Sequence, residues 1–292
     1  MNVVAVKECF INNTDYKNIL IHALNEDTLP NGDVTSSSLI PDDHTSTFKL
    51  VLNDSAVLAG LEVFKDVFCL VDKNINIDFK FKDGDKIDKN TDIAFVSGKT
   101  LAILKGERTA LNFISHLSGI ATLTREMVEL IDGTGVQLLD TRKTTPTLRL
   151  LEKQALKIGG AVNHRFNLSE MVLIKDNHIA SVGSAREAVL KAKRTFGGRL
   201  KIEVEVENID ELKEVIPLNP DIIMFDNWSV LELEEAVKLV PSDILTEASG
   251  QITPENIVKY ANTGVKYISS SYMVKNAKWV DFSLSAILKN EL

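Results

Sequence analysis

Apolar and polar positions follow two different patterns along the chain, and the change between them divides it into an N-terminal and a C-terminal part. Residues 47–97 show mostly the short runs that are typical of strands, with a clear turn signal at Asp-Gly-Asp, residues 83–85. Apolar positions recur at helical spacing in residues 15–27 and 62–72. We therefore expect this part to be a small sheet accompanied by helices.

A long helical pattern follows in residues 99–135, and the pair Ser118-Gly119 predicts a break near its middle. The stretch is long enough to connect two domains. A further helical segment, residues 147–157, has Pro146 near its first turn and Gly159 past its end, the usual asymmetry of helix termini. On this segment we expect Lys153 and Lys157 to lie on a solvated face.

In the C-terminal part, short apolar runs alternate with helical segments. The runs end at or near Asp140, Lys175, Glu205, Asp226, Ser249 and Ser271. Repeated strand–helix units predict a parallel sheet with right-handed crossovers. Because only six or so units fit into about 140 residues, we expect an open, incomplete β/α barrel of about six to seven parallel strands. A doubly wound open sheet is the alternative, which the lack of a G-x-G-x-x-G after these strands weakens.

Composition and charge narrow the class of protein. The 292 residues are 44% hydrophobic and 25% charged, which is ordinary for a soluble globular protein. The formal net charge of -8 argues against a nucleic-acid partner, so any anion site must be a local basic island. The two cysteines, Cys9 and Cys69, have no metal-binding spacing and fit a reducing compartment. With neither a signal peptide nor a membrane span in the sequence, we expect a cytoplasmic protein.

Candidate chemistry collects at the ends of the predicted parallel strands, where the active sites of β/α folds are built. Solubility explains one polar strand end, but hardly a polar end on nearly every strand. A cationic group consists of Arg142, Lys143, His164, Arg165 and Lys175. Arginine offers planar, bidentate recognition of carboxylates, and lysine offers a compact charge.

A pair of carboxylates, Glu205 and Asp226, forms the opposite electrostatic half on neighbouring strands. Such a pair suits Mg²⁺ held through oxygens and water. Together the two halves predict an anionic substrate and a metal-bound phosphate compound. The late loops after Ser249 and Ser269 offer backbone N–H groups and hydroxyls, a reasonable but weak signal for a phosphate cradle. The remaining histidines match no such group and are expected at the surface or in packing: His22, His44 and His116.

Several of these segments together resemble the quinolinate phosphoribosyltransferases. The most specific are DTRKTTP (residues 140–146) and VLIKDNHI (residues 172–179), in this order and spacing. The resemblance runs from about residue 32 to residue 288. It implies a type II phosphoribosyltransferase fold, with an N-terminal α/β sandwich over residues 1–115, a barrel over 116–275, and a C-terminal segment, 276–292, that returns to the sandwich.

The resemblance also implies a reaction. Quinolinate and 5-phosphoribosyl-1-pyrophosphate would give nicotinate mononucleotide, pyrophosphate and CO₂ with Mg²⁺, in NAD synthesis. The quinolinate carboxylates would be held by Thr141, Arg142, His164, Arg165 and Lys175, together with Arg108 from the partner subunit of a homodimer or a multiple of dimers. The catalytic residues would be Lys143, between substrate and pyrophosphate, and the pair Glu205 and Asp226, at the ribose and its metal. The expected 5′-phosphate cradle comprises Ser249, Gly250, Gln251, Ser271 and Tyr272.

Three positions depart from the family pattern. Gln251 and Ser271 stand where the family usually has glycine, and Lys275 stands where it usually has histidine. Because glycine lets the backbone approach phosphate oxygens closely, we expect phosphate binding with altered geometry. Two alternatives stay open: a phosphoribosyltransferase for another pyridine carboxylate such as nicotinate, and a non-catalytic phosphometabolite-binding relative.

Overall fold

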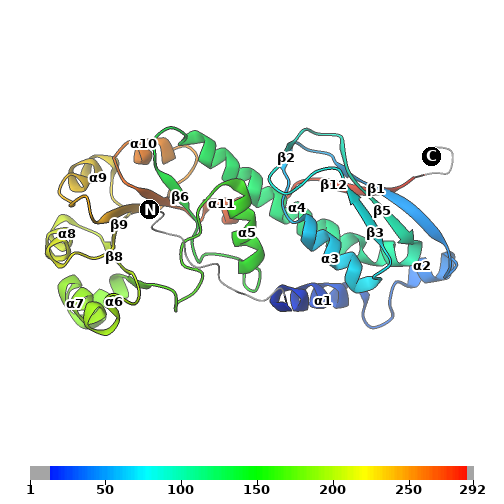
Figure 1. Cartoon of the computed structure of the whole chain (residues 1–292), viewed down its shortest axis with the longest axis horizontal. Coiled ribbons are helices and arrows are strands. Elements are labelled where there is room, and N and C mark those ends of the chain that lie inside the picture. Colours follow the sequence, from blue (N-terminus) through cyan, green and yellow to red (C-terminus); the bar gives the residue numbers. More distant parts are fainter. Residues whose placement is uncertain (1–13, 288–292) are drawn as a thin grey trace. The chain divides into compact units, whose positions relative to one another are not determined.

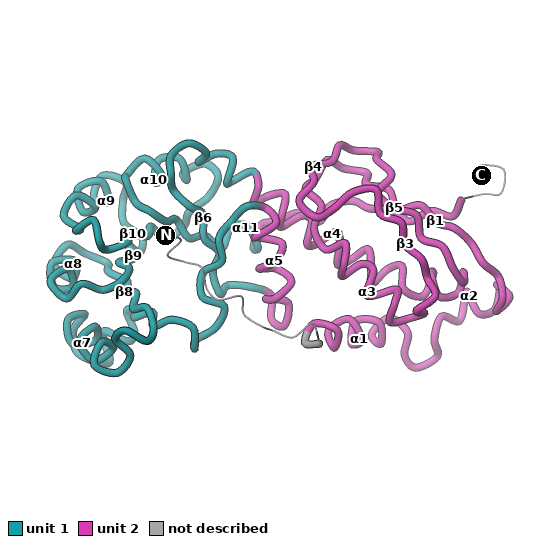
Figure 2. Tube along the Cα trace, viewed as in Figure 1, with its two compact units in different colours: residues 1–9, 126–144, 160–275 teal, residues 10–125, 145–159, 276–292 magenta. Residues whose placement is uncertain are grey.

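The computed structural model describes residues 14–287, and within them the chain forms two compact units (Figure 2). One unit comprises the described residues 14–125, 145–159 and 276–287, and the other comprises residues 126–144 and 160–275. In this grouping and in the division expected from the sequence, one boundary lies within the long helix α4 and another lies after Lys275. The segment 145–159, however, groups with the N-terminal part.

The N-terminal unit is built on an antiparallel sheet with the strand order β12-β1-β5-β3. The strands are β1 (Thr45–Leu52), β3 (Asn76–Phe79), β5 (Thr91–Lys99) and β12 (Phe282–Ala286). Because β12 pairs with β1, from Phe48↔Ala286 to Leu52↔Phe282, the C-terminal segment completes this sheet (Figure 1). The short strands β2 (Ala56–Val57) and β4 (Lys86–Ile87) pair separately, so the confirmed turn at residues 83–85 does not close a hairpin between β3 and β4.

Helices accompany this sheet as the sequence pattern predicts. They are α1 (Thr14–Thr28), α2 (Val34–Leu39), α3 (Leu61–Val71), α4 (Thr100–Leu130) and α5 (Arg149–Gly159). Helix α3 buries Phe64, Val67 and Phe68 completely, and the rings of Phe64 and Phe68 meet edge to face at 5.1 Å. Fully burying three such side chains contributes about 1.5–3 kcal/mol each, which holds the helix in the core of the unit.

The second unit is a six-stranded parallel sheet, as predicted, with the strand order β6-β11-β10-β9-β8-β7. The strands are β6 (Gln137–Leu139), β7 (Val172–Ile174), β8 (Ile202–Val206), β9 (Ile222–Asp226), β10 (Leu245–Ser249) and β11 (Tyr267–Ser269). An additional parallel bridge joins Leu139 of β6 to Val162. The sheet matches the expected open, incomplete barrel.

Helices connect these strands. They are α6 (Asp176–Val182), α7 (Ala185–Phe196), α8 (Ile209–Val215), α9 (Val230–Val237), α10 (Ile257–Ala261) and α11 (Tyr272–Lys275), with a 3₁₀ turn at Ile216–Leu218. Helix α9 shows how the sequence sets a boundary, because Ser229 and Glu232 form a reciprocal capping box at its first turn. No helix within residues 14–287 is both long and apolar enough to cross a membrane. Cys69 is a free thiol, whereas Cys9 lies outside the described residues.

Three expectations about helices were wrong. Helix α4 runs unbroken through Ser118 and Gly119. Helix α5 begins two residues later than predicted, at Arg149, because Thr147 has a φ of 71°, which a helix cannot accommodate. On α5, Lys157 is exposed as expected, but Lys153 is only 2% exposed and belongs to the buried face.

Two glycines on these helices serve close packing rather than helix termination. A Cβ at Gly119 would lie 2.1 Å from the backbone oxygen of Lys278, and a Cβ at Gly159 would lie 2.5 Å from Cβ of Thr124. Gly119 thus gives the C-terminal segment room to pass directly over α4. The same segment is tied to the helix by the N–H of Val280, which donates to the backbone oxygen of Ser115 at 3.1 Å.

We predict that Gly119→Ala lowers the free energy of unfolding by at least about 2 kcal/mol, although alanine is the better helix former by about 1 kcal/mol. The clash is with main chain, which cannot turn aside as a side chain can. Gly106→Ala in the same helix is the control, because its Cβ would meet the Phe68 ring at 3.0 Å, and we expect a smaller loss. Urea denaturation compares the two, and a Gly119→Ala variant more stable than wild type would contradict the account.

Candidate active site

The carboxyl ends of the six parallel strands lie at one edge of the sheet, and most of the predicted site residues follow them. Lys175 follows β7, Glu205 lies near the end of β8, Asp226 ends β9 and Ser249 ends β10. Register joins these positions across neighbouring strands, because Asp226 of β9 is paired with Ser249 of β10. The sheet therefore brings together residues that are up to 130 positions apart in the sequence, such as Asp140 after β6 and Ser270 after β11.

The first strand end is anchored by a buried carboxylate. Asp140 is 0% exposed, and its Oδ1 accepts the backbone N–H of His164 at 2.8 Å. The backbone N–H of Asp140 donates to the oxygen of Val162. The next residues turn back on themselves, because the N–H of Lys143 donates to Oγ1 of Thr141 at 3.0 Å. Lys143 itself is exposed, which leaves its charge available to a ligand.

Two guanidinium groups of the cationic group lie close together. Arg165 is 6% exposed, and Nη1 donates to the backbone oxygen of Met171 at 3.0 Å. Burial lowers the pKa of Arg165, and the like charge of Arg142 lowers it further, against the opposing effect of Glu203. The Nε of Arg165 is buried without a hydrogen-bond partner among the described residues. The pair therefore concentrates positive charge at this edge of the sheet.

Beneath these cations lies a buried cluster of His164, Glu203 and Glu247. Nδ1 of His164 accepts the N–H of Arg165 at 2.8 Å, so the ring proton is on Nε2, which donates to Oε2 of Glu203 at 3.0 Å. Glu247 lies 3.8 Å from the same nitrogen. The three ligand atoms lie within 4.8 Å of one another, a spacing that would suit a metal. A protonated Nε2 cannot be a ligand, however, so we assign the cluster to proton sharing.

Glu205 and Asp226 lie on the neighbouring strands β8 and β9. Glu205 is 5% exposed and accepts a hydrogen bond from Nζ of Lys175, which is half-buried. Burial raises the pKa of Glu205, the bond from Lys175 lowers it, and the neighbouring charge of Asp226 raises it again. Two carboxylates close enough to repel, both at a strand end, are the hard oxygen donors that Mg²⁺ prefers. The donor set therefore fits the ion.

The loop after β10 is shaped by positive φ angles. Gly250 has a φ of 102°, and a Cβ there would lie 2.4 Å from Oδ1 of Asn227, so only glycine fits. Gln251, one of the departures from the family pattern, has a φ of 49°, the left-handed conformation that glycine adopts most easily. After β11, Oγ of Ser270 accepts the N–H of Tyr272 at 3.0 Å, and Ser271 is half-buried.

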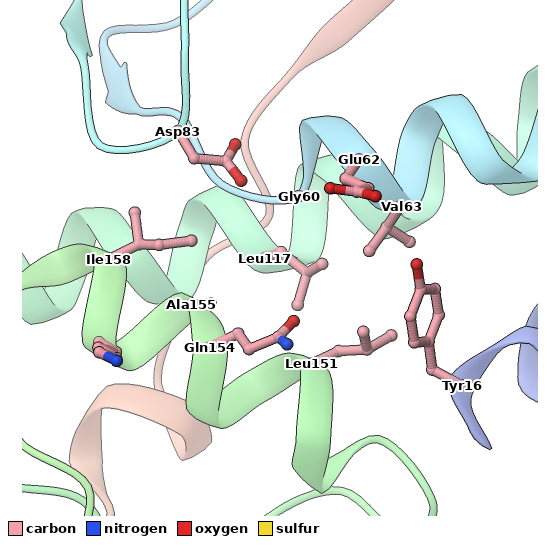
Figure 3. Close-up of a pocket in the computed structure, with 11 residues that line it drawn as sticks. Tyr16, Gly60, Glu62, Val63, Asp83, Leu117, Leu151, Gln154, Ala155 and Ile158 are labelled. Atoms are coloured by element: carbon pink, nitrogen blue, oxygen red, sulfur yellow. The ribbon is translucent and has the colours of Figure 1, made fainter. Parts of the chain in front are cut away.

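Arg108 lies in the other compact unit, exposed on α4. It lines a hollow of about 700 Å³ together with His116 and Trp279 of the same unit. His116 was expected to be a surface or packing residue. Its Nε2 is instead hydrogen-bonded to Oε1 of the fully buried Glu152 at 2.9 Å. A second hollow in this unit, about 310 Å³, has Tyr16, Glu62 and Asp83 around it (Figure 3).

Sequence reasoning missed two buried carboxylates, Glu203 and Glu152. Glu203 lies in β8, a strand buried along its whole length, where the alternation Glu-Val-Glu-Val-Glu reads as a half-exposed strand. Glu152 lies beside Lys153 in a helix whose charges suggest solvent. Neither position carries a signal that separates a buried charge from a surface one.

Comparisons with known proteins agree with the resemblance in sequence. Residues 33–118 match the family model of the quinolinate phosphoribosyl transferase N-terminal domain, and residues 120–285 match that of the C-terminal domain. A probable nicotinate-nucleotide pyrophosphorylase [carboxylating] of Bacillus subtilis (strain 168) is 42% identical over 96% of both chains. A quinolinate phosphoribosyltransferase [decarboxylating] of Nicotiana tabacum is 38% identical over 92% of this chain and 82% of its own. The solved structure of the nicotinate-nucleotide pyrophosphorylase from Francisella tularensis has a TM-score of 0.90 at 38% identity, over 95% of this chain and 98% of that one.

We predict that the buried acid cluster makes stability fall as pH rises. Burial raises the pKa of Glu203 and of Glu247 to about 8, from 4.5 for an ordinary glutamate. The folded state therefore binds protons more tightly than the unfolded state, and this stabilisation, complete below pH 4.5, is lost as pH rises through about 8. Each such proton contributes a slope of about 1.4 kcal/mol per pH unit.

Urea denaturation between pH 5 and 8, a range set by these pKa values, measures the effect. Glu247→Gln removes one titrating group and its repulsion of Glu203, so we expect a flatter dependence than in wild type. Glu214→Gln, at an exposed position on α8, serves as the control. Identical pH dependences for wild type and Glu247→Gln would refute the assignment.

Proposed function

The chain belongs to the quinolinate phosphoribosyltransferase family, and we propose that it joins quinolinate to 5-phosphoribosyl-1-pyrophosphate, giving nicotinate mononucleotide, pyrophosphate and CO₂. The observation that carries the proposal is a cationic cluster and a carboxylate pair at one edge of the parallel sheet, in a chain that matches the family along nearly its whole length. The ring nitrogen would bond to C1 of the ribose as the bond from C1 to pyrophosphate breaks. Carbon dioxide would then leave the quaternised ring, which accepts the electron pair and takes up a proton.

The cationic residues suit the two carboxylates of the pyridine substrate. Arg142 and the buried Arg165 supply planar donors, and Lys175 supplies a point charge at the junction with the carboxylate half. Both ring nitrogens of His164 are hydrogen-bonded within the protein, so we propose that His164 contacts quinolinate through the edge of its ring. We propose that Lys143, whose side chain is exposed, contacts the pyrophosphate. Binding and orientation in a partly desolvated site provide most of the proposed rate acceleration.

Glu205 and Asp226 are the proposed ligands of Mg²⁺, and the same two carboxylates are proposed to face the ribose.

 Their oxygen donors suit a divalent cation at this edge of the sheet. Burial raises the pKa of Glu205, and the neighbouring charge of Asp226 raises it further. When bound, the ion would neutralise pyrophosphate charge as that group departs. The chain's own carboxylates would stabilise the positive charge that develops on the ribose as its bond to pyrophosphate loosens.

We further propose a homodimer in which Arg108 of one copy completes the site of the other, and the cytoplasm as its compartment. Arg108 is exposed on α4 and lies in a different compact unit from the rest of the cationic group, which suits a residue that serves a second copy. The loop that carries Gly250 and Gln251 is the proposed cradle for the 5′-phosphate, together with Ser249, Ser271 and Tyr272.

Two other functions are less well supported. A substrate with one carboxylate, such as nicotinate, would not need as many cations as this site collects. A non-catalytic phosphometabolite-binding protein would not need the carboxylate pair Glu205 and Asp226.

We predict that the purified protein forms nicotinate mononucleotide and CO₂ from the two substrates only when Mg²⁺ is present. Arg142→Ala is expected to lower kcat/KM for quinolinate by about ten- to a hundredfold, because a hydrogen bond to a charged partner contributes about 1.5–3 kcal/mol. Arg186→Ala, at an exposed position on α7, is the control and should leave kcat/KM unchanged. Product formation from nicotinate instead of quinolinate would favour the first alternative, and binding without product would favour the second.

The sharing of Arg108 predicts that two weakly active variants restore activity when they are mixed. In a heterodimer of Arg108→Ala and Arg142→Ala, one site has both arginines and the other has neither. With random exchange of subunits, about a quarter of wild-type activity should return, since half of the dimers are mixed and each has one intact site. No recovery, under conditions in which labelled subunits demonstrably exchange, would exclude the shared site.

A further inference from the structure

Glu152 is a buried carboxylate whose two oxygens hold two different segments. It lies in α5 and is 0% exposed. Oε2 accepts the backbone N–H of Thr145 at 2.9 Å, and Oε1 accepts Nε2–H of His116 at 2.9 Å. All three residues belong to the same compact unit. Both oxygens of the carboxylate are therefore used to fix one point of main chain and one side chain of α4.

The carboxylate is held in its charged form. Burial by itself would raise the pKa of Glu152, but the hydrogen bonds from His116 and Thr145 outweigh it, and the pKa is lowered. His116 is in turn packed against Trp279, with ring centroids 5.7 Å apart, and its side chain is 16% exposed. Packing against Trp279 thus limits the movement of His116, the donor that orients Glu152.

The main chain beside Glu152 is in an unfavourable conformation. The N–H of Leu148 donates to the oxygen of Thr145 at 3.1 Å, which closes a turn with Pro146 at its second position. Thr147, at the third position, has a φ of 71°. This is the pattern of a type II turn, in which the third position favours glycine, and a β-branched residue there is a marked outlier. Such strain persists only where the surrounding structure imposes it.

Glu152 brackets this turn from both sides. Its side chain holds the N–H of Thr145 at the start, and its backbone N–H donates to the oxygen of Leu148 at 3.0 Å at the end. Thr145 follows Arg142 and Lys143 by only three and two residues. At the other end of the same loop, the Asp140 carboxylate accepts the N–H of His164. Arg142 and Lys143 therefore lie in a short loop. It begins at the buried carboxylate Asp140 and ends at Thr145, whose N–H is bound by the buried carboxylate of Glu152.

We propose that Glu152, oriented by His116, is a positioning residue that holds the main chain at Thr145, shortly after Arg142 and Lys143, and so limits the movement of these two residues during the reaction. The inference rests on the proposed function, since it names what the loop is held for. Neither Glu152 nor His116 touches the substrate in this scheme. Their effect passes through the N–H of Thr145 and along four residues of main chain.

Kinetics of four variants test the proposal. Glu152→Leu removes the hydrogen bond to Thr145, and His116→Leu removes the donor that orients Glu152. We expect each variant to lower kcat/KM about ten- to a hundredfold, mainly by raising KM for quinolinate, because small misplacements of binding groups cost that much. His116→Gln keeps an N–H donor for Glu152 and should stay close to wild type. Because both residues act through one contact, the double variant Glu152→Leu/His116→Leu should be no worse than Glu152→Leu alone.

A second readout does not depend on activity. Trypsin cleaves after arginine and lysine, so the rate of cleavage after Arg142 and Lys143 reports how firmly the loop is held. We expect faster cleavage in Glu152→Leu and His116→Leu at a temperature where both are folded, but wild-type rates in His116→Gln. Gln154→Leu, at an exposed position on α5, is the matched control. If Glu152→Leu does not fold, Glu152→Gln and His116→Leu provide the same comparison.

The possible outcomes separate the two claims. If the wild-type protein forms no product but the variants show the expected cleavage rates, the proposed function is refuted and the positioning role of Glu152 is supported. Unchanged KM and unchanged cleavage in both leucine variants, whatever their loss of stability, would overturn the positioning role. Additive losses in the double variant would also overturn it, since they would mean two independent effects.

Discussion

The site depends on one constraint: charged side chains must be stabilised where little water reaches them. At the polar edge of the barrel, the guanidinium of Arg165 is 6% exposed and lies near a second guanidinium, that of Arg142. An uncompensated buried charge costs several kcal/mol, so such a pair persists only with partners. Glu203 offsets this charge only in its ionised form, and its pKa is raised to about 8, so a doubly negative ligand would supply most of the balance at neutral pH. The two neighbouring guanidinium groups thus favour a ligand with two negative charges.

The buried carboxylates have a second task, which is to hold main chain. Asp140 accepts the N–H of His164, and Glu152 accepts the N–H of Thr145. Because a carboxylate accepts several strong hydrogen bonds, it can satisfy loop N–H groups that no strand or helix serves. Electrostatics and loop geometry are therefore coupled in this protein. Replacing one such residue would change both the local charge and the path of the chain.

Much of the fold could be predicted because its signals are local. Strands such as β7 and β9 are short apolar runs followed by polar residues, and helices such as α7 and α9 have periodic apolar positions. The exceptions were decided by packing. Gly119 has the pattern of a helix breaker but makes room for the backbone of Lys278, which is distant in the sequence. Lys153 has the pattern of an exposed residue but is buried.

The sequence by itself determined which residues stand at the strand ends, and with the family resemblance it determined the chemistry to expect there. Only the tertiary structure decided which charges are buried and what they hold. Glu203 below His164, and Glu152 between His116 and Thr145, are ordinary glutamates in the sequence. Their roles arise when folding removes water from them and brings hydrogen-bond donors from other segments to them. The free energy of an ionisable group depends on these surroundings and not on its neighbours in the chain.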